Sequence, residues 1–223
     1  MWLINSSVGR KLVMSISGLF LVLFVTFHMA MNLVAVISED GYDAICEFLG
    51  AHWYALAGTA VLALGFAVHI VYAFILTAQN RRARGTQAYA VTERPKSVEW
   101  ASQNMLVLGL VVILFFCLHL VHFWAKMQLP EILGQSPAGG IDLIKELFSQ
   151  PLYVVLYLVW FVALWFHLTH GFWSALQTLG WSNQVWFNRW KTIGNVWATI
   201  VLIGFAFVAI VFYVKYGVLS CGL

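Results

Sequence analysis

The chain has 223 residues and a formal net charge of +3, with 62% hydrophobic and only 9% charged residues. A water-soluble domain carries about 25% charged residues, so this composition excludes an ordinary soluble enzyme. The basic residues form no arm or stripe, which argues against nucleic acid as a partner, and the three cysteines have no zinc-binding spacing. We expect a single transmembrane domain over residues 1–223.

Five apolar segments are long enough to cross about 30 Å of hydrocarbon, which takes roughly 20 helical residues each. We therefore predict an all-α membrane protein whose five transmembrane helices form one bundle. The first segment is too long for the apolar part of a cleaved signal peptide, so we expect it to remain as a span. The predicted spans are residues 12–37, 53–78, 105–125, 152–177 and 196–216.

Lysine and arginine are unevenly divided between the two sides of these spans. Nine lie at the N-terminus or in the loops after the second and fourth spans, and three lie on the opposite side. The positive-inside rule therefore predicts a cytoplasmic N-terminus and a C-terminus outside. The outer loops are longer and acidic, and the second of them is expected to contain a short amphipathic helix at Ile141–Phe148.

Six of the seven histidines lie inside predicted spans, on four of the five. A polar ring in hydrocarbon is costly unless it is hydrogen-bonded or ligates a metal, so these histidines are functional candidates. The span interiors hold no carboxylate or lysine, which a proton or ion pathway would be expected to include. We interpret the histidines as haem ligands.

The depths of four histidines sort them into two level pairs. At a helical rise of 1.5 Å per residue, His28 and His119 lie about 24 and 21 Å from the cytoplasmic side, and His69 and His167 about 14 and 15 Å. Each pair can supply both axial ligands of one haem. Such bis-histidine coordination suits electron transfer rather than oxygen chemistry. Covalent c-type attachment is excluded, because it needs a Cys-x-x-Cys-His motif that this chain lacks.

Spacing leaves the choice between neighbouring histidines open, because residues three apart on a helix face roughly the same side. The unused member of a couple can contact a haem propionate, a quinone or a neighbouring helix. Two glycines inside spans can admit a macrocycle to the backbone or serve close helix packing. These residues are His119 and His122, His167 and His170, and Gly18 and Gly65.

Short motifs occur along the four histidine-bearing spans. They are Ser7-Val-Gly-Arg-Lys-Leu-Val-Met14 with Ser17-Gly18-Leu19-Phe20, Phe27-His28-Met-Ala-Met-Asn32, Val68-His69-Ile-Val-Tyr72 with Gln79-Asn80, Leu118-His119-Leu, and Phe166-His167-Leu-Thr-His-Gly171 with Trp173-Ser174. In order, spacing and helix placement, the stretch from Gly9 to about Trp181 resembles the dihaem cytochrome b membrane anchor of succinate:quinone oxidoreductases. These are the succinate dehydrogenases and fumarate reductases with a single five-helix anchor.

The resemblance implies a ligand set and a cofactor content. His28 and His119 would bind the iron of the distal haem, and His69 and His167 that of the haem proximal to the cytoplasmic subunits. The family's His-x-x-x-Gly and His-Leu motifs favour these residues over the histidines three positions later. The chain would carry two b haems and exchange electrons with menaquinone or another quinone.

The resemblance also implies partners. A flavoprotein with FAD and an iron–sulfur subunit would bind on the cytoplasmic side. Their cofactors would lie in those subunits, because this chain has neither a dinucleotide fingerprint nor an iron–sulfur cysteine run. Dicarboxylate chemistry would then occur in those subunits. The basic loop Arg81–Lys96 is the expected docking surface, unless its charges only set topology. Quinone would react near the distal haem, with Glu47 and His52 as candidates for proton exchange. The expected location is the bacterial inner membrane.

One position departs from the family pattern. Some fumarate reductases carry a glutamate, thought to carry protons, two residues before the haem ligand on the fourth helix; here that residue is Trp165. This favours succinate oxidation with menaquinone. The alternatives are the dihaem anchor of a nitrate reductase or formate dehydrogenase and, in a different class, a haem-handling transporter. The sequence lacks the tryptophan-rich signature ending in Trp-Asp that haem export would require.

Overall fold

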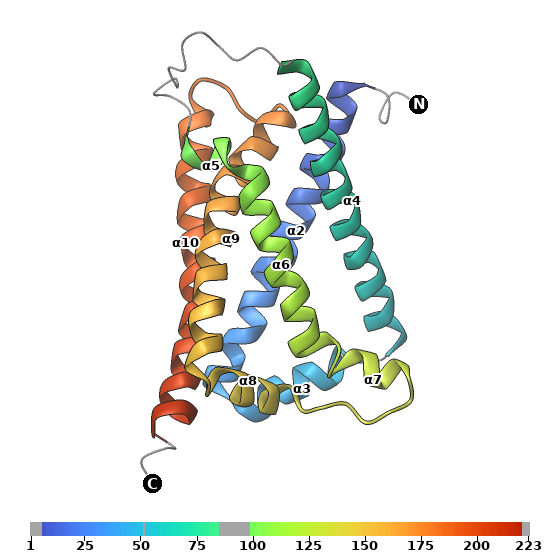
Figure 1. Cartoon of the computed structure of the whole chain (residues 1–223), viewed down its shortest axis with the longest axis vertical. Coiled ribbons are helices and arrows are strands. Elements are labelled where there is room, and N and C mark those ends of the chain that lie inside the picture. Colours follow the sequence, from blue (N-terminus) through green and yellow to red (C-terminus); the bar gives the residue numbers. More distant parts are fainter. Residues whose placement is uncertain (1–5, 51, 85–98, 220–223) are drawn as a thin grey trace.

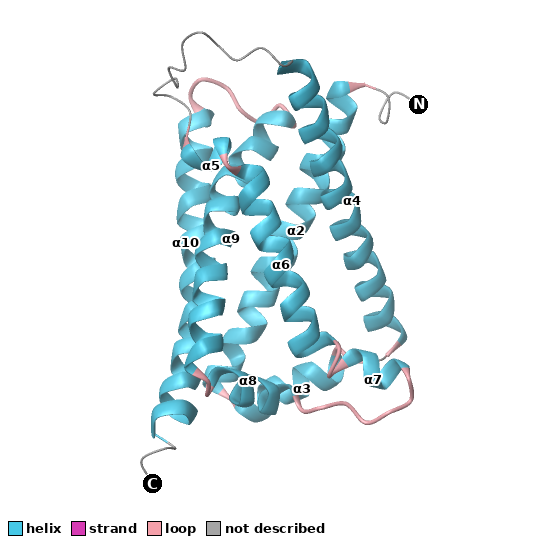
Figure 2. Cartoon of the chain, in the orientation of Figure 1, coloured by secondary structure: helices cyan, strands magenta, loops and turns pink. Residues whose placement is uncertain are grey.

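A computed structural model describes residues 6–50, 52–84 and 99–219, and every regular element in these ranges is a helix (Figures 1 and 2). Five helical segments are long and apolar enough to cross a membrane, so the chain is a multi-pass membrane protein. They are α2 (Ser7–Ile37), α4 (Trp53–Arg84), α6 (Met105–His119) continued by the π-helix η1 (Leu120–Trp124), α9 (Pro151–Thr178), and α10 (Trp186–Phe212) continued by the π-helix η2 (Tyr213–Val218).

All five predicted spans are confirmed, but three are longer than their apolar runs. Helix α2 begins at Ser7, α4 continues to Arg84, and α10 begins at Trp186. Apolarity marks only the part of a helix inside hydrocarbon, whereas backbone hydrogen bonding continues through the interface where long basic side chains reach water. Local capping sets the first boundary, since the Ser6 hydroxyl accepts a 2.9 Å hydrogen bond from the Gly9 amide.

Three short helices gather at one end of the bundle: α3 (Glu39–Phe48), α7 (Gln128–Ile132) and α8 (Gly140–Phe148). Helix α8 confirms the predicted amphipathic helix, and it buries Ile144 almost completely. Helix α3 was not predicted. It begins directly after α2 because the Ser38 hydroxyl caps it, accepting a 3.0 Å hydrogen bond from the Gly41 amide.

The helices pack around α9 and α10, which make the most extensive contact with each other. Helix α2 packs on both and also on α4, while α6 packs on α9. At Gly204 of α10, an added Cβ would collide with the Met29 side chain, so the glycine permits the close approach of α2. Helix α4 packs mainly on α2 and lies at the edge of the bundle (Figure 1).

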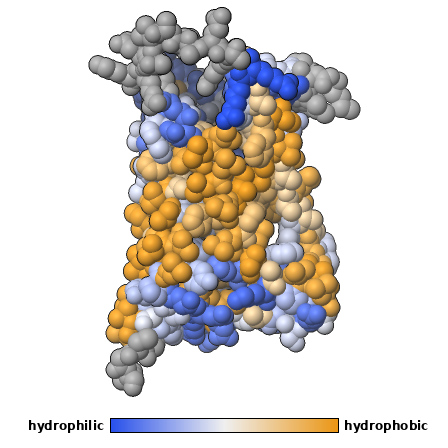
Figure 3. Space-filling model, viewed as in Figure 1, coloured by the Kyte–Doolittle hydropathy of each residue, from blue (hydrophilic) through white to orange (hydrophobic). Residues whose placement is uncertain are grey.

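Both ends of the bundle are hydrophilic, and an apolar belt lies between them (Figure 3). One end, called the basic end, holds the start of α2, the last turns of α4, and α5 (Trp100–Gln103). The other, called the acidic end, holds α3, α7 and α8. Of the predicted docking loop Arg81–Lys96, Arg81 and Arg82 are exposed at the basic end, whereas Arg94 and Lys96 lie outside the described residues.

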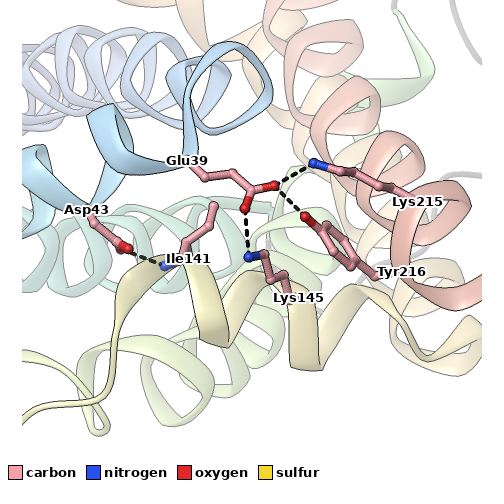
Figure 4. Close-up of polar contacts among 6 residues, drawn as sticks. All are labelled: Glu39, Asp43, Ile141, Lys145, Lys215 and Tyr216. Carbon is pink, nitrogen blue, oxygen red and sulfur yellow. Dashed lines mark hydrogen bonds and ion pairs between the residues drawn. The ribbon is translucent and has the colours of Figure 1, made fainter. Parts of the chain in front are cut away.

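Glu39 joins three segments at the acidic end (Figure 4). Its carboxylate lies 2.7 Å from Lys145 Nζ of α8 and 2.6 Å from Lys215 Nζ of η2, and it accepts a hydrogen bond from the Tyr216 hydroxyl. The hydrogen bond from Lys145, followed in size by those from Lys215 and Tyr216, lowers the pKa of Glu39 to about 2. The ionised carboxylate therefore stabilises the contact between α3, α8 and η2.

Replacing this carboxylate should destabilise the acidic end in a pH-dependent way. Because the pKa of Glu39 is lowered on folding, its contribution is fully present above about pH 4.5 and is lost as the pH falls through about 2. We expect Glu39→Gln to lower the thermal unfolding midpoint in detergent at pH 7 by about 1–4 °C, with no difference near pH 2. Circular dichroism measures both.

Glu146→Gln is the matched control, since the Glu146 carboxylate makes an exposed 3.7 Å ion pair with Lys126. Its midpoint should stay within about 1 °C of the wild type at either pH. A Glu39→Gln midpoint equal to that of this control at pH 7 would contradict the stabilising role of Glu39.

Candidate functional site

Four long helices bring histidines together in two pairs. His28 of α2 faces His119 of α6 with ring centroids 5.7 Å apart, and His69 of α4 faces His167 of α9 at 6.2 Å. Both pairs are nearly perpendicular, with interplanar angles of 85° and 74°. These are the same pairs that the depth argument predicts to be level. Within the described ranges no group of three or more His, Cys, Asp or Glu side chains is placed to hold a metal ion, so the histidines form pairs only.

The two pairs lie at different levels between the membrane faces. His69 and His167 are about 24 Å along their helices from the acidic end, where α4 and α9 begin. His28 lies about 14 Å before the acidic-end terminus of α2. The pairs are therefore stacked about 10 Å apart along the bundle axis, with the His28–His119 pair nearer the acidic end.

Aromatic side chains surround the His28–His119 pair. The Phe24 ring stacks on His28 at 5.3 Å, and the Trp160 indole lies 5.7 Å from His119. Two polar atoms here are buried without a hydrogen-bond partner in the described chain, His119 Nδ1 and Trp160 Nε1. A buried polar atom without a partner is costly, so the surroundings of this pair are suited to a further group that bonds such atoms.

The His69–His167 pair has a similar unpaired atom and a glycine beside it. His167 Nδ1 is buried without a partner in the described chain. At Gly18 an added Cβ would lie 3.3 Å from His69 Cε1, so the glycine leaves room for this ring. Gly65, by contrast, serves helix packing, because an added Cβ there would collide with the Phe20 ring.

The donor set fits the axial ligation of haem. Two imidazoles bound to one metal at about 2 Å per nitrogen have centroids roughly 6 Å apart, close to both separations here. Neutral imidazole is a good metal ligand, and binding through one ring nitrogen leaves the other to bond a neighbouring group. Bis-histidine ligation needs only pairs of residues on facing helices, which is the arrangement present. His28, His119, His69 and His167 are the residues that would hold two haems.

The neighbouring histidines face other groups. His122 lies within η1, and its Nδ1 is 3.1 Å from the hydroxyl of Tyr157. His170 lies edge-on to Trp173, with ring centroids 4.9 Å apart, and its Nδ1 is buried without a partner in the described chain. The π-helical turn begins directly after His119, so the assumption of regular α-helical spacing between His119 and His122 was wrong.

Trp165 holds α9 to α10. Its indole nitrogen donates a 3.0 Å hydrogen bond to the Thr199 hydroxyl. Where some fumarate reductases carry a glutamate, this chain therefore has a side chain that joins two helices and carries no titratable proton.

A separate polar pocket opens at the acidic end. It measures about 420 Å³ and is lined by Glu47, His52, Glu131 and Gln135, so the two predicted proton-exchange residues share one pocket. The His52 ring stacks on Tyr54 at 5.4 Å. Glu131 Oε2 is buried without a hydrogen-bond partner in the described chain, although it lies beside the pocket.

Sequence reasoning missed Glu131 and Gln135. Both belong to the loop between the third and fourth spans, where an acidic or amide side chain is ordinary. Only the folding of α7 against the end of α3 brings them to Glu47, and Gly50 is so close to Glu131 that an added Cβ would lie 2.7 Å from its Oε2.

Gln128 is the buried polar centre beside this pocket. Its Oε1 accepts hydrogen bonds from Thr59 of α4 at 2.9 Å and from the Trp124 indole at 3.0 Å, and its amide donates to the Gly50 carbonyl at 3.2 Å. One side chain thus ties α4, η1 and the α3–α4 connection together. No signal in the sequence distinguishes this glutamine from the chain's other glutamines.

Comparison with known proteins finds no counterpart: no family model, curated protein or solved structure matches the chain. The likeness to dihaem anchors therefore remains a resemblance carried by its short motifs.

Replacing Gln128 should loosen the acidic end. Gln128→Leu leaves the Thr59 hydroxyl, the Trp124 indole and the Gly50 carbonyl without their partner, which costs about 1–3 kcal/mol. Unfolding by dodecyl sulfate, followed by tryptophan fluorescence, measures this loss. The control Gln177→Leu changes an exposed glutamine of α9 and should shift the free energy of unfolding by less than about 0.5 kcal/mol. Equal values for the two variants would contradict the role of Gln128.

Proposed function

We propose that this chain is the dihaem cytochrome b anchor of a succinate:quinone oxidoreductase and passes electrons between an iron–sulfur subunit and membrane quinone. The observation that carries the proposal is the pairing of histidines at two levels on four membrane-spanning helices. The placement of these imidazoles inside membrane-spanning helices supports ligation, because imidazole in hydrocarbon needs a partner. The motif resemblance supports the choice of complex.

Each histidine pair would hold one haem iron through neutral imidazoles. Bound haem supplies reversible one-electron transfer, and bis-histidine ligation leaves no position for oxygen chemistry. The aromatic side chains around the His28–His119 pair exclude water from that level of the bundle. Stacking the pairs about 10 Å apart divides the crossing of the membrane into short steps.

The basic end is the proposed docking side for the flavoprotein and iron–sulfur subunits, and by the positive-inside rule it faces the cytoplasm of a bacterium. Arg81 and Arg82 are exposed there. FAD and the iron–sulfur clusters lie in those partners, where succinate and fumarate react. The proposed direction is succinate oxidation with menaquinone, because Trp165 stands in place of a proton-carrying glutamate.

The polar pocket at the acidic end is the proposed place of quinone chemistry. It opens on the side of the His28–His119 pair. Interconversion of quinone and quinol moves two electrons and two protons, so the site needs titratable side chains open to water. Glu47, His52 and Glu131 supply such groups, and the volume of about 420 Å³ is in the range of pockets for small organic ligands.

The haem content tests the proposal directly. The pyridine haemochrome spectrum of the purified chain should give about two b haems per polypeptide. His28→Ala and His69→Ala should each reduce this to about one, because each removes an axial ligand of a different haem.

His122→Ala and His170→Ala are the matched controls and should keep both haems. A colourless wild-type protein overturns the proposal, and haem loss in the controls but not in His119→Ala and His167→Ala overturns the ligand assignment. FAD, rather than molybdenum, should co-purify with the complex.

Changes in the polar pocket should lower quinone turnover without changing haem content. We expect Glu131→Gln and Glu47→Gln to reduce the rate of quinone reduction by the whole complex about tenfold or more, because each removes a proton-exchanging group. The haem spectra should match those of the wild type. Glu146→Gln serves as the control at the same end, outside the pocket, and should leave the rate unchanged. Wild-type rates in both pocket variants would exclude this pocket.

A further inference from the structure

His69 meets the first transmembrane helix at a serine–glycine step. The Ser17 hydroxyl oxygen lies 3.4 Å from His69 Nδ1, and an added Cβ at the next residue, Gly18, would lie 3.3 Å from His69 Cε1. Ser17 is only 7% exposed. A buried hydroxyl therefore contacts a half-buried imidazole, and the neighbouring glycine lets the two helices approach closely enough for this contact.

The other hydrogen bond of Ser17 determines which atom donates. The Ser17 hydroxyl donates its proton to the Met14 carbonyl at 3.0 Å, so its oxygen presents lone pairs to His69. A hydrogen bond to this oxygen places the proton of the neutral ring on Nδ1 and the lone pair on Nε2.

We propose that Ser17 is a positioning residue that fixes the tautomer and the ring orientation of His69 for metal ligation through Nε2. This deepens the proposed function and rests on it. A ligating histidine commonly bonds its second nitrogen to an acceptor, which orients the ring and raises the basicity of the ligating nitrogen. Ser17 and Gly18 have complementary roles: the serine oxygen accepts the hydrogen bond from His69 Nδ1, and the glycine leaves space for the edge of the His69 ring.

The contact also distinguishes His69 from the histidine that it faces. His167 Nδ1 is buried without a partner in the described chain, whereas His69 Nδ1 has one on the adjacent helix. A more basic ligand favours the ferric state of the iron, so the Ser17 contact lowers the midpoint potential of the haem held by His69. Removing the hydroxyl should therefore act on one haem and leave the other unchanged.

Redox titration of the full complex, followed in the haem α-band, tests this assignment. We expect Ser17→Ala to raise one of the two midpoint potentials and to shift the low-spin electron paramagnetic resonance signal of the same haem, which reports ligand orientation. Ser17→Thr keeps a hydroxyl and should restore both towards the wild type. Thr199→Val is the matched control. Thr199 lies on α10, whose described residues include no histidine, and its hydroxyl accepts the hydrogen bond from the Trp165 indole of α9. This variant should move neither potential.

The outcomes separate this inference from the proposed function. A wild-type chain without haem overturns the proposed function, and this inference with it. A wild type with two haems and a Ser17→Ala variant in which neither potential moves, or both move equally, overturns the inference alone. The same holds if Ser17→Thr behaves like Ser17→Ala or if Thr199→Val gives the same shift. Selective loss of one haem from Ser17→Ala, with the other potential intact, supports it.

Discussion

The structure depends on one constraint: a polar group inside hydrocarbon must find its partner within the protein. For the backbone this requires helices, and all five spans are helical. For tryptophan and threonine side chains it requires bonds between helices, as from Trp197 to Thr26 and from Trp165 to Thr199, both 3.0 Å. For the imidazoles of His119 and His167 the described protein supplies no partner at Nδ1, so these two buried atoms are the places where the constraint is not met.

The constraint also explains why the two ends of the molecule differ. Outside the apolar belt, charged groups can bond one another and water, so the acidic end is joined by Glu39 with Lys145 and Lys215. Here burial is slight and each bond contributes little, whereas the Gln128 network beside it is buried and each bond matters more. The polar pocket opens beside the Gln128 network, where side chains from separate loops can reach water.

Much of the fold follows from patterns that are local in sequence. Apolar length predicts the five spans, and the periodic pattern of Ile141–Phe148 predicts α8, because burial of a helix face leaves a direct trace in composition. Helix ends are less visible in the sequence, since α4 and α10 extend through charged and aromatic residues that lie at the interface. The π-helical turn after His119 leaves no trace in composition, because it arises from packing rather than from propensity.

The candidate site divides in the same way. The levels of the histidines follow from the sequence, because rise per residue and alternating helix direction place His28 level with His119 and His69 level with His167. The tertiary structure then shows that the rings of each pair face one another. The side-chain contacts perpendicular to the helix axes can be identified only in the tertiary structure. Whether Ser17 faces His69, whether Gly65 admits a ligand or the Phe20 ring, and whether Glu131 joins Glu47 all depend on how helices rotate and how distant loops fold together. Sequence separation does not encode these rotations, whereas depth is set by simple counting.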